Sequence, residues 1–162
     1  MMRLLTPVLL FLVAAIADAQ TLRVLNTYKV LCDMTLSAAA GGCTVQQPAT
    51  GSKTVRFIEA VVYCSVACEI TASRDGTAAS STSSAPVALN AEAPTATTTG
   101  WKSSNVGAGT AVSAPLVLAA DVVAVIDISR RQMTGNGTAK NFTLKTNSIT
   151  GRAVIEMVYE EW

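Results

Sequence analysis

Residues 54–74 read TVRFIEAVVYCSVACEITASR, and this stretch decides the fold class. Residues 54–64 are rich in β-branched and aromatic side chains and too continuously apolar for a strand with one exposed face. They therefore predict a strand in the middle of a sheet. Residues 68–74 predict a second strand, which ends before the turn dipeptide Asp75-Gly76.

Cysteines flank the link between these two strands. On one straight strand, at about 3.3 Å per residue, Cys64 and Cys68 would lie roughly 13 Å apart, beyond the roughly 4.4–6.8 Å that a disulfide spans. They can pair only if Ser65-Val66-Ala67 turns the chain, and we expect a three-residue hairpin there. Cys32 and Cys43 enclose a loop rich in Ala and Gly that is flexible enough to close on itself. Local pairing, Cys32–Cys43 and Cys64–Cys68, is our prediction among the three possible pairings.

Zinc binding and redox chemistry are the competing interpretations of the cysteines. The spacing lacks the paired C-x2-C knuckles of a zinc ribbon. It also lacks the C-x-x-C spacing of an oxidoreductase. An even cysteine count in an exported chain favours structural disulfides.

The first residues predict export. Arg3 precedes an apolar stretch over residues 4–16, which ends in Ala17-Asp18-Ala19. This order is typical of a secretory signal peptide, residues 1–19. An uncleaved membrane anchor is the alternative, but the run is shorter than the roughly 20 apolar residues of a spanning helix. We expect a secreted, extracellular product without a membrane span in the mature chain.

The rest of the chain repeats strand signals at short intervals. Residues 24–36 and 152–159 alternate apolar and polar side chains, and residues 122–128 predict a buried strand. Residues 77–114 are mostly small and polar, with frequent Pro, Asn and Gly, and predict short strands and tight loops. The fold class predicted is all-β: an antiparallel two-sheet sandwich or jelly roll in a single domain, residues 44–162, preceded by a strand-like arm and glycine loop, residues 20–43.

Composition argues against most catalytic classes. The chain has 162 residues, half of them hydrophobic and 14% charged, with a formal net charge of +1 and no histidine. Near-neutral charge provides no field for attracting nucleic acid. Without histidine, Ser-His and Cys-His nucleophile pairs and His-containing metal sites are excluded. We therefore predict a protein that is not an enzyme and uses no cofactor and no metal.

Asp121 and Asp127 flank an apolar run and could suggest paired carboxylates. Along one strand they would lie about 20 Å apart, too far for glycosidase chemistry. We expect Asp121 in a turn and Asp127 at a strand end. Arg130-Arg131 is interpreted as a solvated edge charge.

Two tryptophans and two sequons complete the candidate sites. Trp101 lies in a polar segment that we expect to be a loop, where it contacts a sugar or a partner, or folds onto its own core. Trp162 follows Glu160-Glu161 in an acidic end that we expect to be exposed; it covers one end of the sandwich or contacts a neighbour. Asn136 and Asn141 match the glycosylation sequon.

The middle and end of the chain resemble a known class of module. The stretches are VRFIEAVVYCSVACEITASRDGTAA, LNAEAPTATTTGWKSSNVGAGT, LVLAADVVAVIDIS and NFTLKTNSITGRAVIEMVYEEW. Over roughly residues 44–162 they resemble small secreted jelly-roll-like structural modules of bacterial extracellular filaments and phage-type surface proteins. The resemblance implies a structural or adhesive role without a cofactor.

Two functions follow as expectations. The first is a self-assembling extracellular filament or surface subunit, a homo-oligomer in which residues before Cys32 can add a strand to a neighbour. The second is a module that binds a glycan or a cell-surface partner through Trp101 and neighbouring loops.

Overall fold

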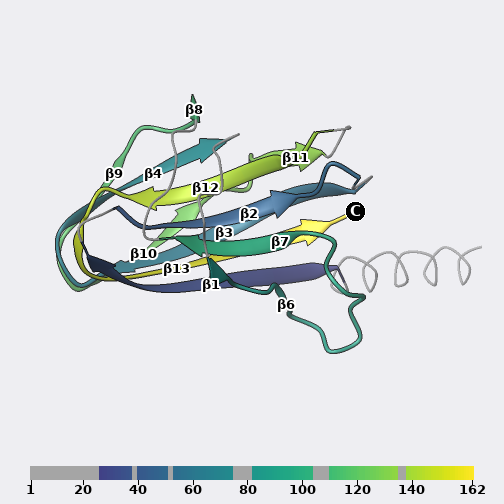
Figure 1. Cartoon of the computed structure of the whole chain (residues 1–162), viewed down its shortest axis with the longest axis horizontal. Helices are drawn as coiled ribbons and strands as arrows, with labels where there is room; N and C mark the ends of the chain where they lie inside the picture. The colour runs from purple at the N-terminus through teal and green to yellow at the C-terminus, as the bar shows by residue number, and fades with distance from the viewer. Residues whose placement is uncertain (1–25, 38–39, 51–52, 75–81, 104–109, 135–137) are drawn as a thin grey trace, which may run out of the picture.

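The computed structural model describes residues 26–37, 40–50, 53–74, 82–103, 110–134 and 138–162. Over these residues the chain forms two antiparallel sheets that pack face to face (Figure 1). Sheet A contains, in spatial order, β10 (Val122–Asp127), β3 (Thr54–Cys64), β13 (Thr150–Glu161), β1 (Thr27–Ser37) and β6 (Val87–Ala88), with β11 (Gln132–Thr134) also beside β3. Sheet B contains β5 (Thr82–Ser83), β7 (Thr99–Ser103), β2 (Gly42–Gln47), β12 (Lys140–Thr146), β4 (Cys68–Arg74) and β8 (Thr110–Ala111), with β9 (Leu116–Leu118) also beside β4. The predicted single-domain β-sandwich is confirmed.

The core lies between the sheets and follows from strand alternation. On β13 the inward positions are occupied by Ala153, Ile155, Met157 and Tyr159, all fully buried, as the sequence pattern predicts. Sheet B contributes large side chains from β2, β4 and β12, and Phe142 packs against Phe57 of sheet A with ring centroids 4.4 Å apart. Burial of each such side chain contributes about 1.5–3 kcal/mol.

Strand β3 lies in the middle of sheet A, as predicted, but only one of its two faces is fully covered. β3 pairs with β13 on one edge and with β10 and β11 on the other. The buried positions of β3 are odd-numbered up to Phe57 and even-numbered from Ala60 onward. A bulge causes this change: Tyr159 pairs with Phe57 and Val158 with Glu59, so Ile58 is an extra residue. This bulge, together with the half-buried Ile58 and Val61, produces the nearly continuous apolar pattern.

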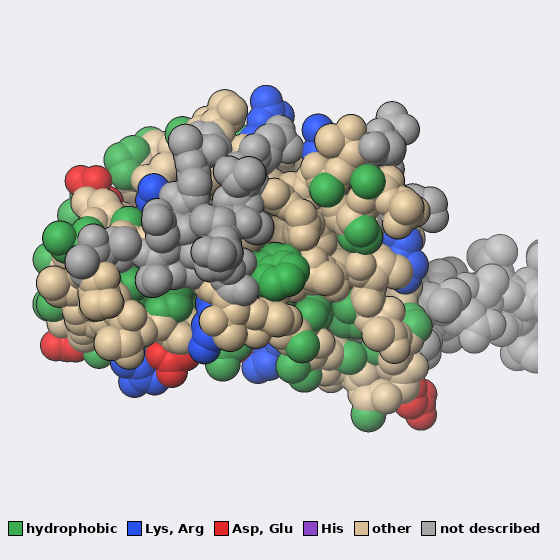
Figure 2. Space-filling view, in the orientation of Figure 1, with side chains coloured by type: hydrophobic (Ala, Val, Ile, Leu, Met, Phe, Trp, Pro, Cys, Tyr) green, Lys and Arg blue, Asp and Glu red, His purple; other side chains and the backbone are tan. Residues whose placement is uncertain are grey.

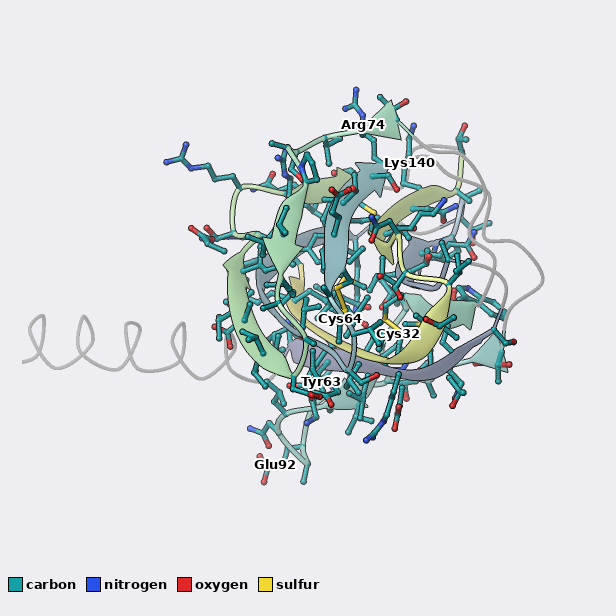
Figure 3. All side chains as sticks on the ribbon, turned by 90° about the vertical axis from the view of Figure 1, so that its left-hand side faces the viewer. Cys32, Tyr63, Cys64, Arg74, Glu92 and Lys140 are labelled. Atoms are coloured by element: carbon teal, nitrogen blue, oxygen red, sulfur yellow. A yellow bond between two sulfur atoms is a disulfide. The ribbon has the colours of Figure 1, made fainter. Side chains whose placement is uncertain are left out.

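Both predicted disulfides form, and each joins the two sheets. Cys32 of β1 is bonded to Cys43 of β2, with Cα atoms 5.6 Å apart, and Cys64 of β3 to Cys68 of β4, with Cα atoms 6.5 Å apart. Cys32 and Cys64 lie in the interior of the sandwich (Figure 3). The predicted hairpin at 65–67 is wrong: both edges of β3 already have partners, so these residues take the chain from sheet A into sheet B.

The strand predicted to be buried at 122–128 is also corrected. β10 pairs only with β3 among the described strands and forms an edge of sheet A. Val122, Val123 and Val125 are 42%, 62% and 66% exposed. An uninterrupted apolar run indicated a covered strand, but the side chains on its outer face have no layer over them.

The segment at 77–114 contains short strands, as predicted: β5, β6, β7 and β8. The predicted arm, residues 20–43, supplies β1 and the first residues of β2 to the sandwich itself. β1 pairs with β13 along its whole length, from Thr27 to Ser37. Residues 20–25 and the predicted signal peptide, residues 1–19, lie outside the described residues.

Candidate functional site

Exposed aliphatic side chains occur on two edge strands of the described structure. We define the assembly edge as the exposed side chains Leu116 and Val117 of β9 together with Val122, Val123 and Val125 of β10. β9 lies at the edge of sheet B beside β4, and residues 119–121 connect it directly to β10 at the edge of sheet A. Five exposed aliphatic side chains on two consecutive edge strands are a candidate interaction site, because large exposed apolar areas are uncommon on monomeric proteins.

Asp121 immediately precedes β10 and Asp127 is its last residue, and both aspartates have local structural roles. Asp121 has a backbone φ of 59°, its N–H donates to the carbonyl oxygen of Cys64, and its carboxylate accepts the Tyr63 hydroxyl at 2.7 Å. That hydrogen bond raises the pKa of Tyr63. Asp127 accepts the N–H of Ser129 at 2.9 Å, and the hydrogen bonds from Ser129 lower the Asp127 pKa. The predicted turn and strand-end roles are confirmed, and the two carboxylates do not form a catalytic pair.

The Arg130-Arg131 pair lies in the turn that follows β10. Arg131 is half-buried, and its guanidinium donates to the carbonyl oxygen of Val112. Arg130 is exposed, which agrees with a solvated charge near the sheet edge. Only one member of the pair is therefore available to a partner.

Trp101 lies on a strand, so the predicted loop is wrong. It belongs to β7, where Gly100 faces the core against Val30, so Trp101 occupies the outer face of sheet B. Its indole N–H donates to the Gln46 amide oxygen at 3.3 Å and to the Thr99 hydroxyl at 3.1 Å. The ring is half-buried and held in one orientation, with one part accessible to a ligand.

A row of residues with hydroxyl side chains extends from Trp101 across sheet B. Register places Thr44 opposite Trp101, Thr143 opposite Thr44 and Ser73 opposite Thr143. The Thr44 and Thr143 hydroxyls are 2.7 Å apart, and both residues are buried. Among the described residues beside Trp101, the side chains that a ligand could reach include the exposed Thr99, the half-buried Gln46 and the exposed Ser83, which pairs opposite Trp101. The broad face in Figure 2 is dominated by uncharged polar side chains and backbone.

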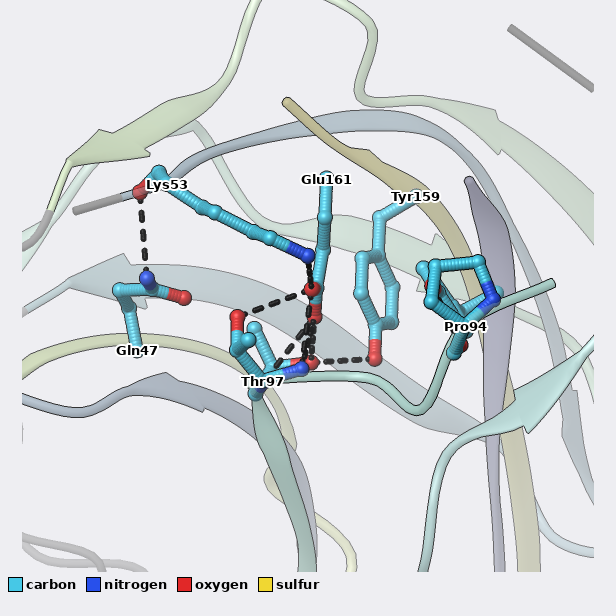
Figure 4. A network of polar contacts seen from close by, with 8 residues as sticks. Gln47, Lys53, Pro94, Thr97, Tyr159 and Glu161 are labelled. Carbon is cyan, nitrogen blue, oxygen red and sulfur yellow. Dashed lines mark hydrogen bonds and ion pairs between the residues drawn. The ribbon is translucent and has the colours of Figure 1, made fainter. Parts of the chain in front are cut away.

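A buried carboxylate lies near the C-terminus, where the sequence predicted an exposed acidic end. Glu161 is fully buried on the inner face of β13. Its oxygens accept the N–H groups and hydroxyls of Thr97 and Thr98 at 2.7–3.0 Å, and Lys53 lies 3.5 Å away (Figure 4). The Thr98 hydroxyl also lies 2.6 Å from that of Tyr159. Alternation along β13 places Glu161 in phase with Tyr159, and this signal could have predicted its burial.

Electrostatics identify Glu161 as a structural group. Burial raises its pKa, but the hydrogen bonds from Thr97 and Thr98 together outweigh burial, and the net shift is downward. Burial raises the pKa of Tyr159, which stays protonated. A carboxylate held ionised and saturated with donors is unsuited to proton transfer.

The remaining predicted residues do not gather into one site. Trp162 is 48% exposed, and its backbone pairs with Thr54. Asn141 is buried on β12, an unfavourable position for attaching a sugar, and Asn136 lies outside the described residues. Among the described residues, no three His, Cys, Asp or Glu side chains are grouped as a metal site requires. In the same part of the chain, no helix has the length and apolarity to span a membrane.

Comparison of the chain with protein-family models, curated proteins and solved structures gave no match.

Proposed function

We propose that the protein is a non-enzymatic, exported β-sandwich that self-assembles into an extracellular filament or surface layer. The assembly edge supports this proposal: five aliphatic side chains between 38% and 70% exposed lie on two consecutive edge strands. An exposed sheet edge with apolar side chains is a template for pairing with another chain.

Most of β10 lacks the features that keep sheet edges apart, and its one charged residue is Asp127 at the end of the strand. Residues 122–126 contain no proline and no charge, and the pairing of β10 with β3 continues without a bulge. Natural edge strands in monomers are usually protected by lysine, proline or a bulge. Retention of an unprotected edge favours a role in assembly.

The two disulfides favour an exported protein. Two disulfides join the sheets, and every cysteine is used. Bridges of this kind persist in oxidising compartments. Together with the predicted signal peptide at residues 1–19, they support an extracellular location.

Strand addition by the N-terminus remains part of the proposal, with a shorter donor. Because β1 is already paired from Thr27 onward and the Asn26 carbonyl oxygen accepts the N–H of Glu161, the donor segment is limited to residues 20–25. In this segment Leu22 and Val24 alternate with Thr21 and Arg23, a pattern suited to a half-buried added strand.

Negative-stain electron microscopy of the mature chain tests the proposal. We expect filaments or sheets at high protein concentration, and their loss in the V123K/V125K variant, whose new charges lie on exposed positions. Leu89→Lys is the matched control, because Leu89 is 52% exposed and follows β6 at the opposite edge of sheet A. Monodisperse particles at every concentration would contradict self-assembly.

Glycan binding at Trp101 is the second candidate function, and the fixed indole favours it. A half-exposed ring beside the Thr99 hydroxyl and the Gln46 amide can stack on a sugar and hydrogen-bond to it. A glycan array should show binding that Trp101→Ala abolishes and Trp162→Ala retains. An array without signal for the wild type would exclude this function.

A further inference from the structure

We propose that two copies of the chain pair through β10, antiparallel and about a two-fold axis at Val125, so that the A sheets of both copies join into one. The inference rests on the proposed self-assembly and names its partner, a second copy of this chain. The contact is isologous and closes a dimer, so a filament requires another interface, such as the N-terminal donor segment.

Backbone geometry supplies the first argument. β10 pairs with β3 on one edge, and on its other edge the described residues provide no strand partner. Along Val122–Asp127, alternate residues therefore direct N–H and C=O groups to an edge that no described strand pairs with, beside exposed valines. A second β10 offers the same groups in the arrangement that an antiparallel ladder needs.

Side-chain alternation limits the register, because directly opposed residues of an antiparallel pair lie on the same face. Centring the pair on Val125 places the two Val125 side chains together on the outer face, with Ala124 opposite Ile126 on the inner face. Centring it on Ala124 instead places Asp121 opposite Asp127 at both ends. Like charges in that position are destabilising, so the Val125-centred register is favoured.

Charge complementarity at the ends supports the same register. The turn that ends at Asp121 in one copy then lies beside the turn containing the exposed Arg130 in the other, and the symmetry repeats this contact. Centring on Val123 loses the contact. The N-terminal segment 20–25 carries Arg23 but no acidic residue, so it would add no carboxylate beside Arg130, which has only Asp127 of its own chain as an electrostatic partner among the described interactions.

The broad outer face of sheet A is less suited to self-association. Its β1 and β13 positions carry the Asp33–Arg152 ion pair, with an N–O distance of 2.7 Å, and the Lys29–Glu156 ion pair at 3.1 Å. Stacking two copies over these charges would remove them from water at a cost that edge pairing avoids. Edge pairing leaves both ion pairs in solvent.

Cysteine cross-linking tests the partner and the register together. In the proposed dimer the two Val125 Cα atoms lie about 4.5–5.5 Å apart, within disulfide range, whereas the two Val123 Cα atoms are separated by roughly 13 Å. Full-length mature V125C should therefore form disulfide-linked dimers at least about 10-fold faster than V123C under mild oxidation. Leu89→Cys measures cross-linking by random collision.

Each outcome of this comparison decides the proposal. Cross-linking of V125C well above V123C and L89C supports it; cross-linking of V123C equal to V125C, or none above L89C, overturns it. A mixture of V123C and D127C chains should also cross-link, because these positions are opposed in the Val125-centred register.

Two further measurements separate this inference from the proposed function. The full-length variant L22K/V24K should keep V125C cross-linking, and its loss would assign β10 to the N-terminal segment instead. Cross-linked dimers without filaments would overturn the proposed filament while supporting the β10 pair. Filaments without V125C cross-linking would overturn the β10 pair alone.

Discussion

At the scale of single residues, Glu161 connects the end of β13 to the segment that precedes β7. Its carboxylate satisfies the N–H and hydroxyl groups of both Thr97 and Thr98, so several donors depend on one charge. Hydrogen bonds to a charged group are individually stronger than neutral ones. The residue therefore fixes this end of the sandwich.

Replacing Glu161 by Gln should destabilise the fold by about 2–4 kcal/mol, because an amide cannot accept from all of these donors and brings donors of its own. Urea denaturation followed by tryptophan fluorescence measures the change. Glu160→Gln is the control, since Glu160 lies on the opposite, partly exposed face of β13 and should change stability by less than about 0.5 kcal/mol. Equal effects of the two substitutions would contradict the assigned role.

Acid should weaken this connection. The pKa of Glu161 in the folded protein lies below its ordinary value of 4.5, despite burial, because of the threonine hydrogen bonds. Its ionised form therefore contributes stability that is present above about pH 4.5 and is lost as the pH falls through the folded-state pKa. Melting temperatures between about pH 3 and pH 7 should fall less toward acid in E161Q than in the wild type. Parallel curves would contradict the lowered pKa.

Gly100 of β7 packs closely against Val30 of the facing sheet and against the backbone of Ser84. A Cβ atom at this position would lie 2.8 Å from both Val30 methyl groups and would collide with the carbonyl oxygen of Ser84. Gly100→Ala should cost about 1–3 kcal/mol through this overlap. Thermal unfolding compared with Thr99→Ala, an exposed neighbour, measures it; an unchanged melting temperature in G100A would contradict the packing.

At the scale of elements, the disulfides staple β1 to β2 and β3 to β4 across the core. Removing a bridge frees the unfolded chain, and the cost grows with the length of the closed loop. C32A/C43A should lose about 3 kcal/mol and C64A/C68A about 2 kcal/mol, measured by urea unfolding. Stability equal to that of the wild type in either double variant would contradict the stabilising role of the disulfide it lacks. Free thiols in the unreduced mature protein would contradict both bridges.

The positions of strands along the chain could be predicted from the sequence. Which strands pair with one another in the sheets could not. The bounds of β3 and β4 agree with the predicted 54–64 and 68–74 because β-branched runs and a turn dipeptide mark them. The predicted hairpin between them failed because local pattern does not reveal that β13 and β10 occupy the edges of β3. The exposure of β10 was missed for a related reason: an apolar run indicates burial, whether the cover is the same chain or another copy.

For the candidate sites too, local features could be predicted from the sequence and contacts between distant strands could not. Four cysteines and a turn were enough to predict the disulfide pairing. The contact of Trp101 with Gln46 depends on β2 and β7 being neighbours, which joins residues far apart in the chain. Such cross-strand contacts arise only from sheet order.

At the scale of the whole molecule, the sandwich combines a well-stapled core with one unprotected apolar edge. The core uses alternate residues of long strands, and both disulfides connect the sheets. The edge leaves backbone groups and valines of β10 toward solvent. Under the proposed function, this apolar edge is where a stable unit would pair with a second copy of itself.

Sedimentation equilibrium of the mature protein over a wide concentration range tests this central claim most directly. Wild type should behave as a dimer or larger species whose mass increases with concentration, whereas V125K should have a lower mass at every concentration, with unchanged circular dichroism. A wild-type mass equal to the monomer at every concentration would contradict the account.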